Sequence, residues 1–151
     1  MIKKSAGLLI YRTRENTRNV VLVHPGGPYW KNKDAGSWSI PKGEFDESED
    51  PLKAAKRETF EEIGIDIIGE FKELKPLKQK SGKIIFAWAI NKDISLDAFT
   101  SNLFEMEWPP RSGQKASFPE VDKVEWFSIS DAKEKIIPGQ LPFLEELESM
   151  L

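Results

Sequence analysis

The chain has 151 residues, 39% of them hydrophobic, and a formal net charge of -3 at pH 7. This length predicts one domain spanning residues 1-151, and the weak negative charge argues against binding of long nucleic acid. The chain contains no cysteine, which excludes disulfides, zinc-thiolate sites and thiol nucleophiles.

Three strands are predicted in the first part of the chain. Ser5 to Arg12 and Asn19 to His24 are rich in aliphatic residues and flank a polar loop, and Trp38 to Ile40 forms a short third strand. The first apolar run, Ala6 to Tyr11, is too short for a signal-peptide core or a bilayer span. We therefore expect a soluble cytoplasmic protein that does not bind a membrane.

His24, the single histidine, ends the second predicted strand and precedes a glycine-proline loop. One histidine excludes metal sites that need two of them. We interpret His24 as a satisfied or solvent-facing residue at a strand end rather than a catalytic one. In the loop that follows, Tyr29 to Lys31 either form one rim of a substrate site or simply pack against the rest of the protein.

Pro51 to Ile63 is predicted to be a helix. Asp50 can cap its first turn, Pro51 suits its first position, and Gly64 can close its end. Four residues at helical spacing form a mainly apolar stripe that can pack on a core, namely Leu52, Ala55, Thr59 and Ile63.

Three acidic side chains, Glu58, Glu61 and Glu62, lie on the border of that stripe. Their spacing allows the carboxylates to converge on one cation, although they should repel each other. Hard oxygen ligands suit Mg²⁺ or Mn²⁺, and Mg²⁺ typically takes further ligands from substrate phosphates. The spacing predicts a divalent-metal site for phosphate chemistry. The alternative is a solvated acidic face on which Arg57 and Glu61 form an ordinary i,i+4 pair.

The segment from Gly43 to Ile65 resembles the Nudix box, G-x5-E-x7-R-E-U-x-E-E-x-G-U, with every fixed letter in place. Thr59 stands where the family usually has an aliphatic residue, and its methyl group can fill much of the same space. The preceding Trp38-Ser39-Ile40-Pro41-Lys42 is also similar to the strand and turn that lead into the box in this family. The resemblance covers roughly residues 6 to 127.

This resemblance implies an α/β protein with the Nudix fold, an α/β/α sandwich around a mixed β-sheet. It also implies roles for individual residues. Glu58, Glu61 and Glu62 would be the main ligands of Mg²⁺ or Mn²⁺ and so catalytic, and the Gly43 carbonyl would be an extra ligand. The remaining box residues are expected to support them, with Glu49 as a supporting acid and Arg57 orienting the carboxylates.

Lys42, on the turn before the box, either neutralises a substrate phosphate or is merely exposed. After the box, Phe71 to Lys78 and Lys83 to Asn91 are predicted to form a hairpin around Ser81-Gly82. The C-terminal part is predicted to contain a strand, Val124 to Ile129, followed by helices at Ser130 to Ile136, capped by Ser130, and at Pro142 to Leu151.

The connection from Asp93 to Pro119 exceeds the usual loop length, and such loops tend to be binding elements, lids or disordered stretches. Phe104 and Trp108 could stack a base while Arg111 and Lys115 reach phosphates, which is the combination expected of a nucleotide site. In the alternative interpretation, the two aromatic residues pin the loop to the core.

Hydrolysis also requires a base, and Nudix enzymes often use a glutamate from a loop after the box. Glu120 is our candidate because it lies six residues before Trp126, at the mouth of the Val124 strand. Glu105 and Glu107 are the competing candidates, and a solvated loop glutamate is the alternative for all three.

The family resemblance implies a Mg²⁺-dependent pyrophosphohydrolase that cleaves a phosphoanhydride bond in a small nucleotide. The segment that leads into the box, Trp38 to Gly43, is similar to that of diadenosine tetraphosphate hydrolases. This similarity favours a nucleoside triphosphate or a dinucleoside polyphosphate as substrate. The alternatives are a hydrolase of ADP-ribose or other nucleoside diphosphate derivatives, a catalytically silent nucleotide sensor, and an acidic-helix interaction protein. The sequence does not predict the oligomeric state.

Overall fold

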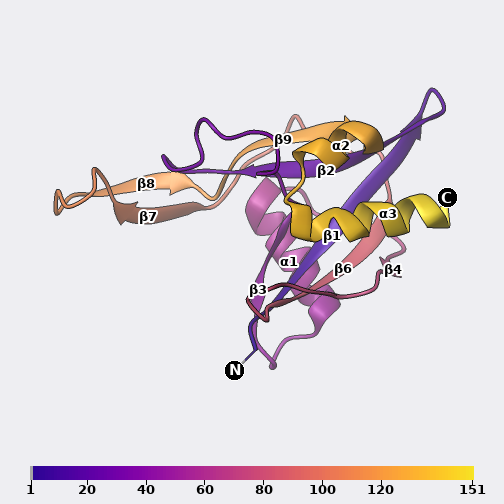
Figure 1. The fold of residues 1–151 in the computed structure, drawn as a ribbon, viewed down its shortest axis with the longest axis horizontal. Helices are drawn as coiled ribbons and strands as arrows, with labels where there is room; N and C mark the ends of the chain where they lie inside the picture. The colour runs from indigo at the N-terminus through magenta and orange to yellow at the C-terminus, as the bar shows by residue number, and fades with distance from the viewer. Residues whose placement is uncertain (1) are drawn as a thin grey trace.

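A mixed seven-stranded sheet forms the centre of the protein in a computed structural model that describes residues 2–151 (Figure 1). Five strands follow the order β4-β6-β1-β2-β9, while β3 pairs with β1 and β5 with β6. These strands are β1 (Lys4–Arg14), β2 (Thr17–Pro25), β3 (Lys42–Phe45), β4 (Lys72–Glu73), β5 (Leu77–Lys78), β6 (Ile84–Asn91) and β9 (Val121–Ser128).

Strand β1 is the hub of this sheet. It runs parallel to β6, from the pair Lys4 and Ile84 to the pair Tyr11 and Asn91, and antiparallel to β2 and β3. Leu8, Leu9 and Ile10 are fully buried although successive side chains point to opposite faces of the sheet. Such burial on both faces is typical of a central strand covered by helices on each side.

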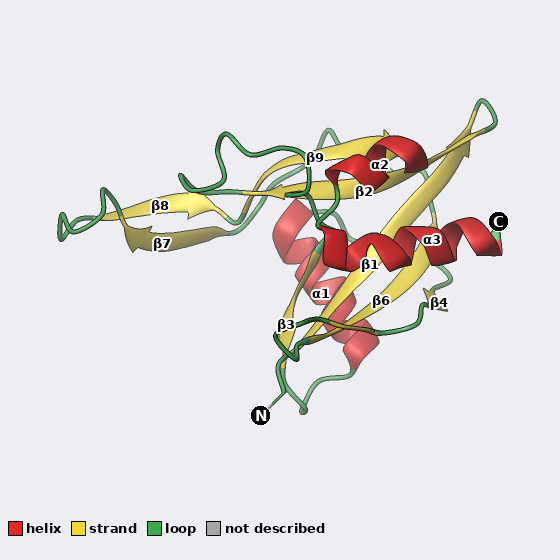
Figure 2. Cartoon of the chain, viewed as in Figure 1, coloured by secondary structure: helices red, strands yellow, loops and turns green. Residues whose placement is uncertain are grey.

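Helices cover both faces of the sheet (Figure 2). On one face, α1 (Pro51–Ile63) buries Ala54, Ala55 and Ile63 in a cluster with Leu8 and Ile10. On the other, α2 (Ile129–Lys135) and α3 (Leu141–Met150) share a cluster with Leu9. A short 3-10 turn, Pro138–Gln140, joins α2 to α3. The predicted α/β/α sandwich is confirmed.

Local signals fix both ends of α1. The Asp50 carboxylate accepts a hydrogen bond from the Lys53 amide at 3.1 Å, and Pro51 occupies the first helical position. Gly64 ends the helix with a φ of 73°, in the left-handed region that favours glycine. Inside the helix the buried Thr59 hydroxyl donates to the Ala55 carbonyl at 2.7 Å, so its polar group is satisfied.

Two local predictions were wrong. Trp38 to Ile40 makes only isolated bridges, of Trp38 with Ile136 and of Ser39 with Val23, and the strand beside it is β3, which the sequence had suggested was a turn. Ser128 rather than Ser130 caps α2, because the Ser128 hydroxyl accepts from the Asp131 amide at 3.1 Å.

The long connection after β6 contains regular structure that the sequence did not indicate. Much of it folds into a hairpin of β7 (Leu103–Glu107) and β8 (Lys115–Pro119), a separate two-stranded sheet. Figure 1 shows that this hairpin projects away from the sandwich.

Within residues 2–151, every helix is too short or too polar to cross a bilayer.

Candidate active site

Three carboxylates project from the last two turns of α1, beside strand β3. Gly43 of β3 lies so close to Glu58 that a Cβ atom at this position would collide with the Glu58 carboxylate. The Glu58 side chain is 12% exposed, and that of Glu61 is 34% exposed. The absence of a side chain on Gly43 therefore lets the β3 backbone approach the acidic face of the helix.

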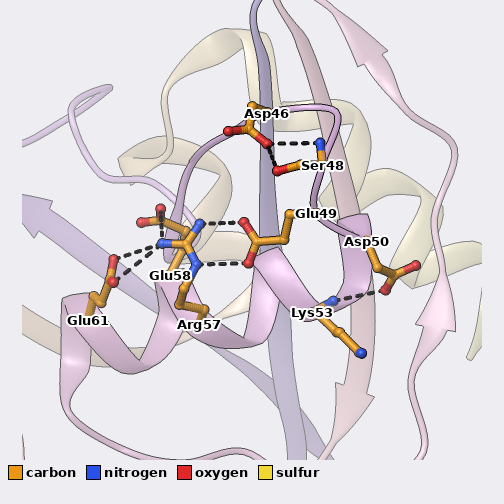
Figure 3. A network of polar contacts seen from close by, with 8 residues as sticks. All are labelled: Asp46, Ser48, Glu49, Asp50, Lys53, Arg57, Glu58 and Glu61. Carbon is orange, nitrogen blue, oxygen red and sulfur yellow. Dashed lines mark hydrogen bonds and ion pairs between the residues drawn. The ribbon is translucent and has the colours of Figure 1, made fainter.

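Arg57 holds several of these carboxylates together (Figure 3). Its Nε and Nη2 atoms donate to the two oxygens of Glu49, at 2.9 and 2.8 Å. Its Nη1 atom donates to Glu58 at 2.8 Å and to Glu61 at 3.2 Å. The guanidinium hydrogen bond holds the pKa of Glu49 below its usual value. These charge-assisted contacts have the geometry that the expected orienting role of Arg57 requires.

Glu62, the next residue of α1 after Glu61, contacts the first residue of β3. Its carboxylate accepts a hydrogen bond from the Lys42 amide at 3.0 Å. Burial raises the pKa of Glu62 to about 8, because the charged form is poorly solvated there. Burial also raises the pKa of Glu58, against the opposing effect of Arg57. A nearby positive charge would stabilise the charged forms of both carboxylates.

A cavity of about 190 Å³ opens next to Glu62. Lys42, Glu62 and Glu120 line it together, although they are far apart in the sequence. Burial lowers the pKa of Lys42, and the neighbouring Lys83 lowers it further. The other residues that line the cavity are Val23, Pro25, Trp30, Ser37, Ser39, Val121 and Ile137.

Glu120 stands immediately before β9 and is fixed in place by its backbone. Its amide donates to the Asn102 carbonyl at 2.8 Å, and its carbonyl accepts from the Gly26 amide at 2.9 Å. Burial raises the pKa of its carboxyl, and the charge of Glu61 adds to this effect. The structure thus brings Glu120 to the same cavity as Glu62.

The structure does not bring the competing glutamates to this cavity. Glu105 and Glu107 lie on β7, in the projecting hairpin, and the Glu107 carboxylate accepts from the Arg111 amide at 2.9 Å. Arg111 lies in the turn of the hairpin, and Lys115 begins β8. Trp108 contacts Tyr29 edge to face, with ring centroids 5.4 Å apart. The expected roles of Trp108, Arg111 and Lys115 in substrate binding stay predictions.

His24 is buried and both of its ring nitrogens are engaged. Nδ1 lies 2.7 Å from the Asp122 carboxylate, and Nε2 lies 2.6 Å from the Lys33 carbonyl. The residue thus joins β2 to β9 and to the loop after β2, in agreement with its interpretation as a satisfied strand-end histidine.

Sequence reasoning missed Ser37 and Ser39 as lining residues of the cavity. They alternate with Trp38 and Ile40, which are buried in the core cluster on the α2 and α3 face. This alternation of polar and apolar residues was the available signal.

The donor set fits a hard divalent cation in its chemistry. Among residues 2–151, no three Asp, Glu or His side chains are gathered into a preformed metal cluster. The observed arrangement instead has Arg57 in contact with Glu58 and Glu61. Glu58 and Glu62, however, are carboxylates whose burial disfavours their charge, and an added cation would offset that cost. Carboxylate oxygens are the ligands that Mg²⁺ and Mn²⁺ prefer.

The sequence profile of the NUDIX domain matches residues 1–147. An RNA pyrophosphohydrolase of Bartonella henselae is 29% identical over an alignment 141 residues long, and the match covers 84% of this chain and 76% of that protein. The m7GpppN-mRNA hydrolase dcap-2 of Caenorhabditis elegans is 33% identical over 114 residues, which cover 75% of this chain but 12% of that longer protein.

Solved structures show the same fold. A binary complex of the Caenorhabditis elegans Ap4A hydrolase superposes with a TM-score of 0.66 at 21% identity and covers 97% of this chain and 96% of that one. The NUDIX domain of Shewanella oneidensis NrtR, complexed with ADP ribose, gives a TM-score of 0.70 at 14% identity and covers 99% and 88%. At these identities the likeness extends to the fold alone.

Proposed function

Because the chain belongs to the Nudix hydrolase family, we propose that it is a divalent-metal-dependent pyrophosphohydrolase that cleaves a phosphoanhydride bond in a nucleotide. The observation that carries this proposal is the cavity that Lys42, Glu62 and Glu120 line together, at the end of the helix that also carries Glu58 and Glu61. Carboxylates, a lysine and a base at one cavity are the groups that water attack on a polyphosphate requires.

In this proposal Glu58, Glu61 and Glu62 hold the ion, with the Gly43 carbonyl as an additional ligand. The ion would supply positive charge to the phosphate oxygens and make a bound water more acidic. Arg57 keeps Glu58 and Glu61 in place through its hydrogen bonds, and its contact with Glu49 fixes the guanidinium itself. Lys42 offers its ammonium to a substrate phosphate from the wall of the cavity.

Glu120 is the proposed general base. Its carboxylate stands at the cavity and would accept the proton of the attacking water. The raised pKa of Glu120, caused first by burial, makes it a better proton acceptor than a fully solvated glutamate. The fixed backbone of Glu120 limits how far this carboxylate can move.

A nucleoside triphosphate or a dinucleoside polyphosphate is the favoured substrate. One support is the segment that leads into the Nudix box, Trp38 to Gly43. The other is the names of the similar proteins, which include RNA pyrophosphohydrolase and Ap4A hydrolase. ADP-ribose is the second candidate, because the similar NUDIX domain of NrtR was solved with that ligand. Cleavage of the diphosphate bond would use the same groups in each case.

Phosphate or nucleotide release from a panel of these substrates, with Mg²⁺ and with EDTA, tests the proposal. We expect Mg²⁺-dependent turnover of at least one compound. Glu61→Gln and Glu62→Gln should each reduce kcat by about a hundredfold or more at unchanged folding, since a metal ligand is lost. Glu145→Gln, an exposed change on α3, is the matched control and should retain full activity. Tight nucleotide binding without turnover of any compound would instead identify a sensor.

A further inference from the structure

The β7–β8 hairpin is attached to the candidate active site at both of its ends. Before β7, the Thr100 amide donates to the Ile63 carbonyl at 3.1 Å, and the Asn102 amide donates to the Glu61 carbonyl at 3.0 Å. After β8, Glu120 donates to Asn102 and accepts from Gly26. The hairpin therefore projects from the sandwich (Figure 1) while its base is tied to α1 and to the candidate general base.

A cleft of about 480 Å³ lies between this hairpin and the loop that follows β2. We call it the hairpin cleft, and its walls include Gly27, Pro28, Lys31, Trp108, Phe118 and Asp122. The hairpin packs closely on the loop, because a Cβ atom on Gly27 would lie only 3.0 Å from the Phe104 ring. Tyr29 is 59% exposed and contacts the Trp108 ring edge to face.

The hairpin cleft neighbours the cavity that Lys42, Glu62 and Glu120 line, which we call the catalytic cavity, because consecutive residues line the two spaces. Pro119 lines the cleft, and the next residues, Glu120 and Val121, line the cavity. On the loop side, Trp30 lines the cavity and Lys31 lines the cleft. The two spaces thus lie on neighbouring residues of the same two segments, the base of the hairpin and the loop after β2.

The hairpin cleft and the catalytic cavity differ in volume. Ligand pockets commonly enclose roughly 300 to 1,000 Å³. The catalytic cavity, at about 190 Å³, is below this range, whereas the hairpin cleft, at about 480 Å³, lies within it. Part of any substrate larger than one nucleotide must lie outside the catalytic cavity.

We propose that the hairpin cleft binds a second nucleobase of the substrate, stacked on Trp108 and Phe118. This inference rests on the proposed function, because it needs a nucleotide held at the catalytic cavity. Flat aromatic side chains suit the face of a base, and the charged groups of Lys31 and Asp122 at the walls suit its polar edge or an adjoining phosphate. Asp122 also contacts His24 Nδ1 at 2.7 Å, so Lys31 is the charged wall residue that suits an adjoining phosphate.

A second base can be joined to the first in two ways. In a dinucleoside polyphosphate it lies at the far end of the phosphate chain, and at the 5′ end of a triphosphorylated RNA it lies across a phosphodiester bond. The shared chemistry is a base held beyond the cleaved diphosphate group. Turnover of dinucleoside tetraphosphate and of a 5′-triphosphorylated dinucleotide distinguishes these sources, with ATP as the substrate that has one base.

The test compares kcat/KM of these three substrates for the wild-type chain, Trp108→Ala, Trp108→Phe and Leu103→Ala. The wild-type chain should cleave at least one substrate with two bases about tenfold more efficiently than ATP. Trp108→Ala should remove most of that advantage through KM, whereas Trp108→Phe keeps a flat ring and should retain most of it. Leu103 is 66% exposed on the same hairpin, and its replacement by Ala should change none of the three values.

Two results would overturn the inference. One is a wild-type chain that cleaves ATP as efficiently as both substrates with two bases. The other is an equal loss on all three substrates in Trp108→Ala, which would assign the tryptophan a merely structural role. If the wild-type chain cleaves none of the three and also none of the wider panel, the proposed function itself fails, and the inference fails with it.

Discussion

Arg57 contacts carboxylates both inside and outside its own helix. Spacing alone predicts its contact with Glu61, one turn away, because residues four apart face each other on a helix. The contact with Glu49 joins α1 to the segment before it and depends on the path of the chain around Asp50. The sequence pattern therefore indicated the acidic set, and the structure adds how one guanidinium holds its members.

Removal of this guanidinium should weaken the metal site without removing a ligand. In Arg57→Ala, Glu58 and Glu61 lose their shared donor and can spread apart, so we expect metal affinity and kcat each to fall about 10- to 100-fold. The metal dependence of turnover measures both effects. Arg14→Ala, which removes a guanidinium from an exposed ion pair with Asp93, is the control. Unchanged metal affinity in Arg57→Ala would contradict the orienting role.

Glu62 should make the stability of the metal-free protein depend on pH. Its folded-state pKa, about 8, lies above the value of roughly 4.3 expected for an unfolded chain. The folded state therefore binds the proton more tightly, and this contribution to stability is fully present below about pH 4 and is lost as the pH rises to about 8. Glu62→Gln, which stays neutral, should be more stable than the wild-type protein at pH 8 by roughly 1 to 3 kcal/mol.

Urea unfolding in EDTA at pH 5 and pH 8 checks this expectation. The difference between Glu62→Gln and the wild-type chain should be larger at pH 8. A difference that is equal at both values, or larger at pH 5, would show that the Glu62 carboxyl is not held in a poorly solvated position.

At the scale of elements, α1 was predictable because its signals are local. The cap, the first proline, the apolar stripe and the closing glycine all lie within the segment itself. Strand β3 was missed because only its pairing with β1 makes it a strand. The β7–β8 hairpin was missed for a related reason, since its strands pair with each other rather than with the central sheet.

The cap of α1 gives a direct test of how this helix is fixed. In Asp50→Ala the Lys53 amide loses its acceptor, and the folded state should be destabilised by about 1 kcal/mol. Asp50→Ser keeps a capping oxygen and should recover most of the loss. Chemical unfolding of the three proteins measures the effect. Equal stability of the Ala and wild-type chains would show that the Asp50 contact does not stabilise the helix.

At the scale of the whole molecule, the candidate site joins segments that are remote in sequence. The site is formed where Lys42, the first residue of β3, meets the end of α1 and the start of β9. The local box pattern located Glu58, Glu61 and Glu62, but the placement of Glu120 depends on the register of β9 against β2. Only the resemblance to a family, not local periodicity, indicated that residue.

Charge explains why a cation is central to this arrangement. The chain carries a net charge of -3, and a polyphosphate is itself an anion, so the protein as a whole does not attract its proposed substrate. Burial also disfavours the charged forms of Glu58 and Glu62. A divalent ion shared between these carboxylates and the substrate phosphates would turn this repulsion into attraction.

Manganese binding in the presence of a non-hydrolysable nucleotide analogue tests this central claim most directly. Titration calorimetry of the wild-type chain should show that the analogue strengthens Mn²⁺ binding. Glu58→Gln, Glu61→Gln and Glu62→Gln should each weaken that binding by about tenfold or more, whereas Glu145→Gln should not change it. Equal Mn²⁺ affinity in all of these proteins would place the ion elsewhere and contradict the account.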